Sequence, residues 1–204
     1  MKIEPFDIAN IDIVAAILAK MWGKDIANGI EHCFEFSREV VFNMFFDPQL
    51  ALQACDDDGT LQAVAFARMK DDINTSEQWV ENFLVGKDDE ERKKVLEATA
   101  YLLRTEQELL DLMSEDSAKF SFLLSYKRGY AKALQERLMQ MLIDRGVRWT
   151  YHITDSTCSW QYFDHHGFER IHEELVERFS TEEKPYYCYM YRKPIFSHAW
   201  SLRQ

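Results

Sequence analysis

The chain has 204 residues and a formal net charge of -11, which predicts one domain over residues 1–204 and argues against general nucleic-acid binding. Its four cysteines are scattered without a CxxC pair, so neither a disulfide framework nor a zinc knuckle is indicated. Because no apolar run is long enough to cross a membrane and the N-terminus lacks the apolar core of a signal peptide, we expect a cytoplasmic protein without a membrane partner.

The first third of the chain predicts a strand, two helices and a β-hairpin. Residues 3–6 form the strand, and residues 7–21 follow with apolar side chains at helical spacing, with Asp7 or Asn10 as the cap. Residues 39–46 are a second apolar helical segment. Two strands at 50–55 and 60–69 then flank three aspartates and Gly59, which is a strong hairpin signal.

An acidic helical insertion is expected at residues 70–117. Residues 71–116 carry 14 acids and 5 bases. The acids at 88–91 favour a helix start, where the helix dipole is positive, and an apolar stripe from Val95 to Met113 predicts one buried face. We expect this helix to pack against the body of the domain. A dimer contact and a cover over the active site are the alternatives.

The second half of the chain alternates strands and helices. We expect a strand at 120–125, a helix at 129–145 ending before Gly146, and an alternating strand at 147–154. Asp155 and Ser156 can cap a short helix that ends at Gly167. Residues 170–176 and 186–192 form a final strand pair. This order predicts an α/β fold whose sheet mixes antiparallel and parallel strands.

A basic turn joins the strand at 120–125 to the helix that follows it. Residues 119–148 hold 7 bases and 2 acids. A strand that runs directly into a helix N-terminus leaves free amide groups and partial positive charge at the turn. With Lys127 and Arg128 beside those amides, the turn predicts a site for a phosphorylated ligand such as a pyrophosphate. The alternative is an exposed basic face that balances an acidic neighbour.

Two segments resemble the GNAT superfamily of N-acetyltransferases. The turn through Gly129 and Ala131 resembles the family's acetyl-CoA motif, (Q/R)xxGx(G/A), although Tyr126 stands at the Gln/Arg position. Residues 154–158 and 162–168 resemble its second motif, a strand end followed by a short helix closing in Gly-Phe. The resemblance spans nearly the whole chain apart from residues 70–117. It implies a mixed, largely antiparallel central sheet with one splayed parallel pair, helices on both faces, and the insertion between the hairpin and the cofactor-binding strand.

The resemblance also implies acetyl-CoA as a co-substrate and no metal. The backbone at residues 123 and 124 would bind the pantetheine arm like an added strand, and amides from 127 to 132 would hold the pyrophosphate. Gly129 allows close approach of the backbone, and the lysines and arginine add charge-assisted contacts. The expected cofactor-binding residues are Leu123, Leu124, Ser125, Lys127, Arg128, Gly129, Tyr130, Ala131, Lys132 and Ser156.

For catalysis we expect direct acetyl transfer to a primary amine. Asp155 could take the proton of the amine through water, although its alternative role is a helix cap. Phe163 occupies the position where the family often has a tyrosine acid. Its neighbour Tyr162 is the candidate acid, and a half-buried packing role is the alternative for Tyr162. A thiolate can also leave without an acid, since the pKa of a thiol is about 8.5. Cys158 as a nucleophile lacks a visible histidine partner.

The acceptor is a small-molecule or peptide amine, and the acidic insertion favours a cationic one such as a polyamine, an aminoglycoside-like amine or a lysine side chain. The spacing of the histidines at 165, 166 and 172 matches no common zinc pattern, so we expect surface histidines. The rival hypothesis is a catalytically silent acyl-CoA-binding or protein-interaction module. A structural protein without a coenzyme A site is a third alternative, and a homodimer is compatible with each.

Overall fold

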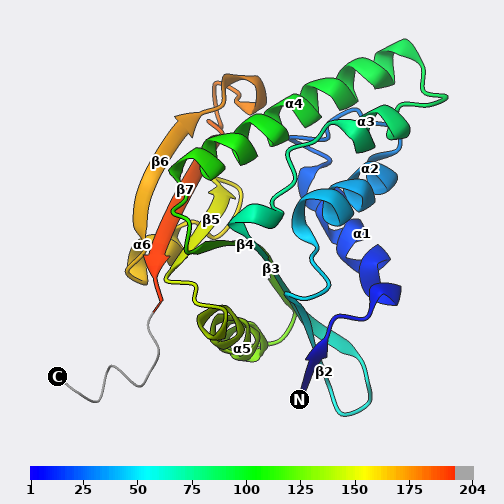
Figure 1. Cartoon of the computed structure of the whole chain (residues 1–204). Coiled ribbons are helices and arrows are strands. Elements are labelled where there is room, and N and C mark those ends of the chain that lie inside the picture. Colours follow the sequence, from blue (N-terminus) through cyan, green and yellow to red (C-terminus); the bar gives the residue numbers. More distant parts are fainter. Residues whose placement is uncertain (196–204) are drawn as a thin grey trace.

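The computed structural model describes residues 1–195, which carry a seven-stranded sheet in the order β1-β2-β3-β4-β5-β7-β6 (Figure 1). Neighbouring strands are antiparallel except β4 and β5, which are parallel. The predicted mixed sheet is therefore confirmed. The strands are β1 (Lys2–Pro5), β2 (Ala51–Cys55), β3 (Leu61–Met69), β4 (Ser117–Ser125), β5 (Trp149–Asp155), β6 (Glu169–Leu175) and β7 (Tyr187–Pro194).

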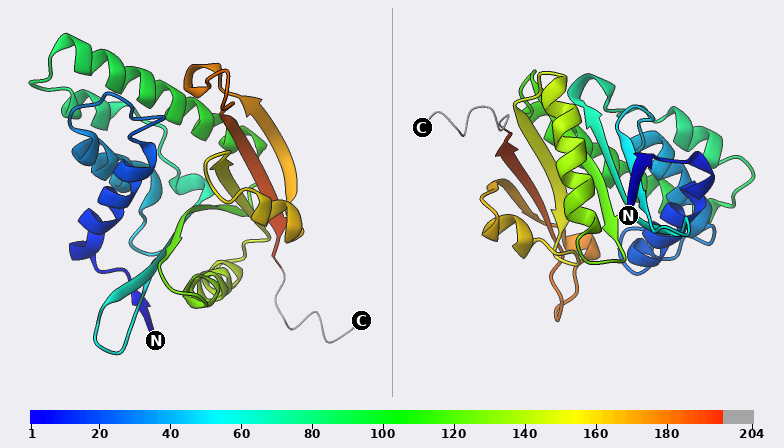
Figure 2. Two further views of the ribbon diagram at one scale, coloured as in Figure 1. Left: turned by 180° about the vertical axis from the view of Figure 1, so that it is seen from behind. Right: turned by 90° about the horizontal axis from the view of Figure 1, so that it is seen from below.

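Helices cover both faces of this sheet. Helix α5 lies against one face, and α1, α2 and α4 lie on the other, as the views in Figures 1 and 2 agree. None of the helices in the described residues is long and apolar enough to cross a membrane. The helices are α1 (Ile11–Trp22), α2 (Cys33–Val40), α3 (Gln78–Phe83), α4 (Asp89–Leu112), α5 (Tyr130–Asp144) and α6 (Gln161–His165).

The alternation of side chains along β3 separates the two faces. Its small residues Ala63, Ala65 and Ala67 belong to the core under α5, which leaves room for the leucines of that helix. These leucines recur every four residues, as one buried helix face requires. Val64 and Phe66 point the other way into the larger core with α1, α2 and α4. Burial of each large side chain stabilises the fold by about 1.5–3 kcal/mol.

The acidic insertion contains the predicted long helix, α4, and also the short helix α3, which the sequence did not predict. The Asp88 carboxylate caps α4 by accepting the Glu91 amide at 2.8 Å. Val95 and Leu102 of its apolar stripe are buried in the same core as α1. The expectation that this helix packs against the body of the domain is confirmed.

Two boundaries differ from the prediction in ways that affect the site. The second helix begins at Cys33 and continues into a π-helical turn at Val41–Phe45; we missed its first turns because polar residues interrupt them. Strand β4 begins at Ser117 and not at Phe120. The earlier start adds Lys119 to the strand.

Candidate functional site

Strands β4 and β5 separate at the centre of the sheet. They pair only from Ser117 to Lys119 and from Trp149 to Tyr151. Beyond these residues β4 continues to Ser125 and β5 to Asp155, and the two strands do not pair with each other. The facing backbone edge of β4, which includes Leu123 and Leu124, is therefore open to an added extended segment.

The turn from β4 into α5 presents backbone amides. The Ser125 hydroxyl donates to the Lys127 carbonyl at 2.8 Å, and the Tyr126 amide donates to the Gln62 carbonyl at 2.8 Å, which fixes the entry to the turn. Within residues 1–195, the amides of 127–129, 131 and 132 have no hydrogen-bond acceptor. Gly129 adopts φ +91°, a conformation that suits glycine. An anion can approach these amides at the helix N-terminus.

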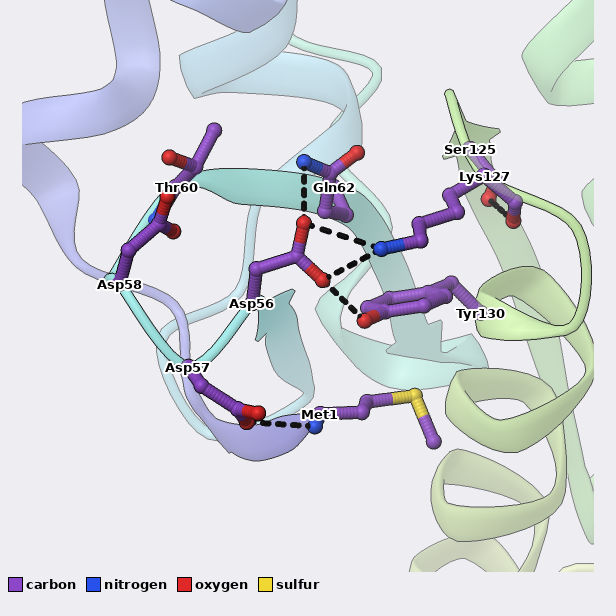
Figure 3. A network of polar contacts seen from close by, with 9 residues as sticks. All are labelled: Met1, Asp56, Asp57, Asp58, Thr60, Gln62, Ser125, Lys127 and Tyr130. Carbon is purple, nitrogen blue, oxygen red and sulfur yellow. Dashed lines mark hydrogen bonds and ion pairs between the residues drawn. The ribbon is translucent and has the colours of Figure 1, made fainter.

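The cations of the turn differ in what they contact. The Lys127 ammonium lies 2.9 Å from the Asp56 carboxylate at the tip of the β2–β3 hairpin, and the Tyr130 hydroxyl donates to the same carboxylate (Figure 3). Hydrogen bonds from Tyr130 and then Lys127 lower the pKa of Asp56. Arg128 is exposed, and the largely exposed Lys132 is 3.8 Å from Glu136. Within the described residues Arg128 is therefore the cation of the turn without an ion pair, while Lys127 and Lys132 each lie beside a carboxylate.

A pocket with about 150 Å³ of space opens at the split between β4 and β5, on the face covered by α1 and α4. Phe122 of β4 and Ile153 of β5 belong to its wall. Helix α1 contributes Leu18 and Trp22, and α4 contributes a turn of residues from 101 to 106. The pocket thus reaches the split from the face opposite to α5. Helix α4 both packs in the core and covers this pocket.

Asp155 lies at the end of β5 and lines the pocket. One of its carboxylate oxygens accepts the Thr157 amide at 2.7 Å, which closes a turn after β5, and the other lies 3.7 Å from the Cys158 sulfur. Burial first, and then the Asp155 charge, raise the pKa of Tyr186, which also lines the pocket.

Because α6 begins only at Gln161, with Trp160 as its N-cap and no side-chain cap bond, the expectation that Asp155 or Ser156 caps this helix is wrong. The Asp155 carboxylate instead closes the turn after β5 and lies in the pocket wall.

The remaining predicted residues lie around this centre. The Tyr162 hydroxyl is 3.5 Å from Gln135 of α5, and the ring stacks on His166; Tyr162 does not line the pocket. The Ser156 hydroxyl accepts the Tyr187 amide at 3.0 Å, so it is held by the start of β7. Burial raises the pKa of Cys158 to about 11, which keeps its thiol protonated and counts against a nucleophile.

A buried ion pair in the pocket was missed by the sequence analysis. The Lys119 ammonium lies 2.5 Å from both carboxylate oxygens of Glu106, and the two residues are 2% and 1% exposed. Burial lowers the pKa of Lys119, and Glu106 opposes that shift. A sequence signal existed: Glu106 stands four residues after Leu102 and three before Leu109, on the apolar stripe of α4.

Two clusters of acidic and histidine side chains lie elsewhere in the described chain. Glu31, His32 and Glu91 form one, and the Glu91 carboxylate pairs with His32 and with Lys87. Glu108, His172 and Glu174 form the other, and Arg104 pairs with both of its carboxylates. In these clusters Glu91, Glu108 and Glu174 therefore each pair with a basic side chain of the protein, in competition with a metal ion.

Solved structures share this fold. An agmatine N-acetyltransferase aligns over 95% of this chain and 99% of its own, at 12% identity and a TM-score of 0.60. Arylalkylamine N-acetyltransferase 2 from Aedes aegypti aligns over 96% and 99%, at 14% identity and a TM-score of 0.57. A polyamine N-acetyltransferase from Drosophila melanogaster aligns over 95% and 99%, at 12% identity and a TM-score of 0.58.

This chain has the fold of the GNAT N-acetyltransferases. No protein-family model and no curated protein matches its sequence. At these low identities the likeness concerns the fold. In this chain that fold contains both the turn before α5 and the split between β4 and β5.

Proposed function

We propose that this protein is an acetyl-CoA-dependent N-acetyltransferase that transfers the acetyl group directly to a primary amine. The observation that supports it best is that two sites meet at one split in the sheet. The turn before α5 offers unbonded amides and exposed cations, and the pocket reaches the split from the opposite face. A thioester donor and an amine acceptor could thus approach each other between β4 and β5.

The residues of the turn fit a coenzyme A diphosphate. Amides from Lys127 to Lys132 would bind its oxygens, Gly129 would permit close approach, and Arg128 would add a charge-assisted contact. The open edge at Leu123 and Leu124 would bind the pantetheine arm. When bound, acetyl-CoA supplies an acetyl group activated as a thioester.

In the proposed reaction Asp155 removes a proton from the acceptor ammonium, directly or through water, before the nitrogen attacks the carbonyl carbon. The C–S bond then breaks with its electron pair on sulfur as the new C–N bond is completed, and the second proton of the nitrogen passes to the departing thiolate or to water. Backbone amides at the strand split would stabilise the oxyanion. Tyr162, whose hydroxyl faces Gln135 outside the pocket, would be at most a minor acid for the thiolate, which can leave unprotonated.

The test is release of free thiol from acetyl-CoA in the presence of a panel of primary amines. We expect amine-dependent release, together with heat on binding coenzyme A in calorimetry. Absence of binding heat with coenzyme A and its thioesters would overturn the proposal, because the turn would then not be a coenzyme site.

A catalytically silent coenzyme-binding module is the second candidate function. The observation in its favour is Phe163, which fills the position of the usual tyrosine acid and stacks on Tyr191 at 4.9 Å in the core. A thermal shift on addition of coenzyme A, without turnover of any amine in the panel, would favour this module over the enzyme.

A further inference from the structure

The charges in the pocket restrict which amines it can hold. Among the described residues that line it, the charged side chains are Glu106, Lys119 and Asp155. The first two form the buried ion pair, so the Glu106 carboxylate is already neutralised by Lys119. The Lys119 ammonium also lies 5.3 Å from the centre of the Phe45 ring. Asp155 is therefore the one carboxylate in this wall that has no cationic partner in the pocket.

Asp155 stands at the split, where the attacking nitrogen has to be. An acceptor with one ammonium group can place it near this carboxylate. A second ammonium deeper in the pocket would meet the Lys119 charge and no unpaired anion. Since burying an unpaired charge is strongly unfavourable, the pocket selects against diamines and polyamines.

The rest of the pocket is apolar and rich in aromatic rings. Trp22 of α1, Phe45 of the π-helical turn and Phe122 of β4 line it, together with Tyr101 of α4. These rings come from segments that pack in the main core, so packing holds the side chains that line the pocket in place. Its volume of about 150 Å³ limits the size of the body that it can hold.

We infer that the acceptor is a monoamine whose nitrogen is attached to a compact apolar or aromatic body, and that polyamines are excluded because the pocket, in which Lys119 neutralises Glu106, offers no free anion to a second ammonium. The inference rests on the proposed acetyl transfer and names its substrate class. It narrows the cationic acceptors expected from the acidic insertion to those with one charge.

The first test compares 2-phenylethylamine with 1,4-diaminobutane and agmatine as acceptors at saturating acetyl-CoA. We expect kcat/KM for 2-phenylethylamine to exceed that of either dication at least tenfold. Equal or higher values for a dication would overturn the inference while leaving the acetyltransferase intact. Absence of thiol release from every amine would instead be the failure of the proposed function. Quenching of Trp22 fluorescence, with Trp22→Phe as the blank, then compares binding of the same amines without turnover.

The second test changes the pair itself. Lys119→Met frees the Glu106 carboxylate for a second ammonium, so the ratio of kcat/KM for 1,4-diaminobutane to that for 2-phenylethylamine should rise at least tenfold. The matched control is Lys94→Met, which removes a lysine from an ion pair of α4 with Glu90 at the surface; its ratio should not change. An unchanged ratio in a folded Lys119→Met protein contradicts the inference.

Lys119→Met leaves a buried carboxylate unpaired and can prevent folding. The double variant Lys119→Met/Glu106→Leu removes both charges together, and it tests the inference if Lys119→Met does not fold. It should still prefer 2-phenylethylamine at least tenfold, because its pocket has no anion for a second ammonium. Equal use of the monoamine and the diamine by the double variant would overturn the inference.

Discussion

The Lys127 ammonium lies 2.9 Å from the Asp56 carboxylate, which joins the turn before α5 to the tip of the β2–β3 hairpin (Figure 3). The Gln62 side-chain amide donates to the same carboxylate at 2.9 Å, and the Tyr130 hydroxyl donates to it as well. This relationship positions the turn. It also puts a negative charge beside a site proposed to bind an anion.

Asp56→Asn is therefore expected to tighten binding of coenzyme A. The amide keeps the shape of the carboxylate, removes its repulsion of a diphosphate and frees the Lys127 charge. Because exposed pairs of this kind are weak, we expect a roughly two- to five-fold lower Kd in calorimetry at low salt.

Asp57→Asn is the matched control for that charge. Asp57 lies on the same hairpin and pairs with the N-terminal amino group, so its removal changes the net charge equally without touching Lys127. Weaker binding by Asp56→Asn, or equal tightening in both variants, would show that the Asp56–Lys127 pair does not restrain the phosphate site.

Local residue patterns predicted the helices and strands, whereas contacts between elements that are distant in the sequence form the pocket. The hairpin and the glycine turn follow from short residue patterns, and each formed as expected. The ion pair joins α4 to β4. In the sequence alone, Glu106 is one acid of an acidic insertion, and Lys119 is the residue before the predicted strand. Only the packing of α4 over the split brings Glu106 to Lys119. Boundary errors of a few residues at β4 were enough to hide the pair.

Gly129→Ala should raise the Kd for coenzyme A by more than the loss of folding stability in this variant explains. At φ +91° a side chain strains the backbone, which costs about 1–2 kcal/mol of the free energy of unfolding. A Cβ atom there meets no neighbour within 4 Å, so in the free protein the strain is the whole cost. In the complex the methyl group would additionally obstruct the approaching diphosphate.

Gly86→Ala supplies the control, because Gly86 has φ +78°, is equally open, and lies between α3 and α4. Both variants should lose similar stability in denaturant unfolding, and Gly129→Ala alone should raise the Kd for coenzyme A. A Kd unchanged in Gly129→Ala would place the diphosphate elsewhere.

Asp155→Asn should lower kcat about 100-fold, the usual scale for loss of a general base. The amide cannot take a proton, although its oxygen can still accept the Thr157 amide and preserve the turn after β5. Tyr162→Phe should change kcat by less than about threefold, since its hydroxyl faces Gln135 outside the pocket and the thiolate can leave without help. Steady-state thiol release measures both. A loss of kcat in Tyr162→Phe as large as that in Asp155→Asn would instead assign the acid to Tyr162 and contradict the prediction.

His152 makes the stability of the protein sensitive to mild acid. Its ring is buried between Phe120, Phe163 and Phe168, and burial, aided by the Lys193 charge, lowers its pKa to about 3. In the unfolded chain the pKa is about 6.5, so below that pH the unfolded state binds a proton that the folded state does not. Stability is therefore retained above pH 6.5 and falls as the pH drops toward 3, by about 2 kcal/mol between pH 6.5 and 5.

His152→Phe removes this titration and keeps an aromatic ring in the same stack. The free energy of unfolding, measured by urea denaturation at pH 7.5 and pH 5, should fall about 2 kcal/mol less in the variant than in the wild type. The comparison uses the change with pH within each protein, so any cost of fitting the new ring cancels. His165→Gln, which replaces an exposed histidine of α6, should leave the wild-type change in place. An identical loss in His152→Phe and the wild type would mean that other groups cause the acid sensitivity, and that His152 does not stay neutral in the core.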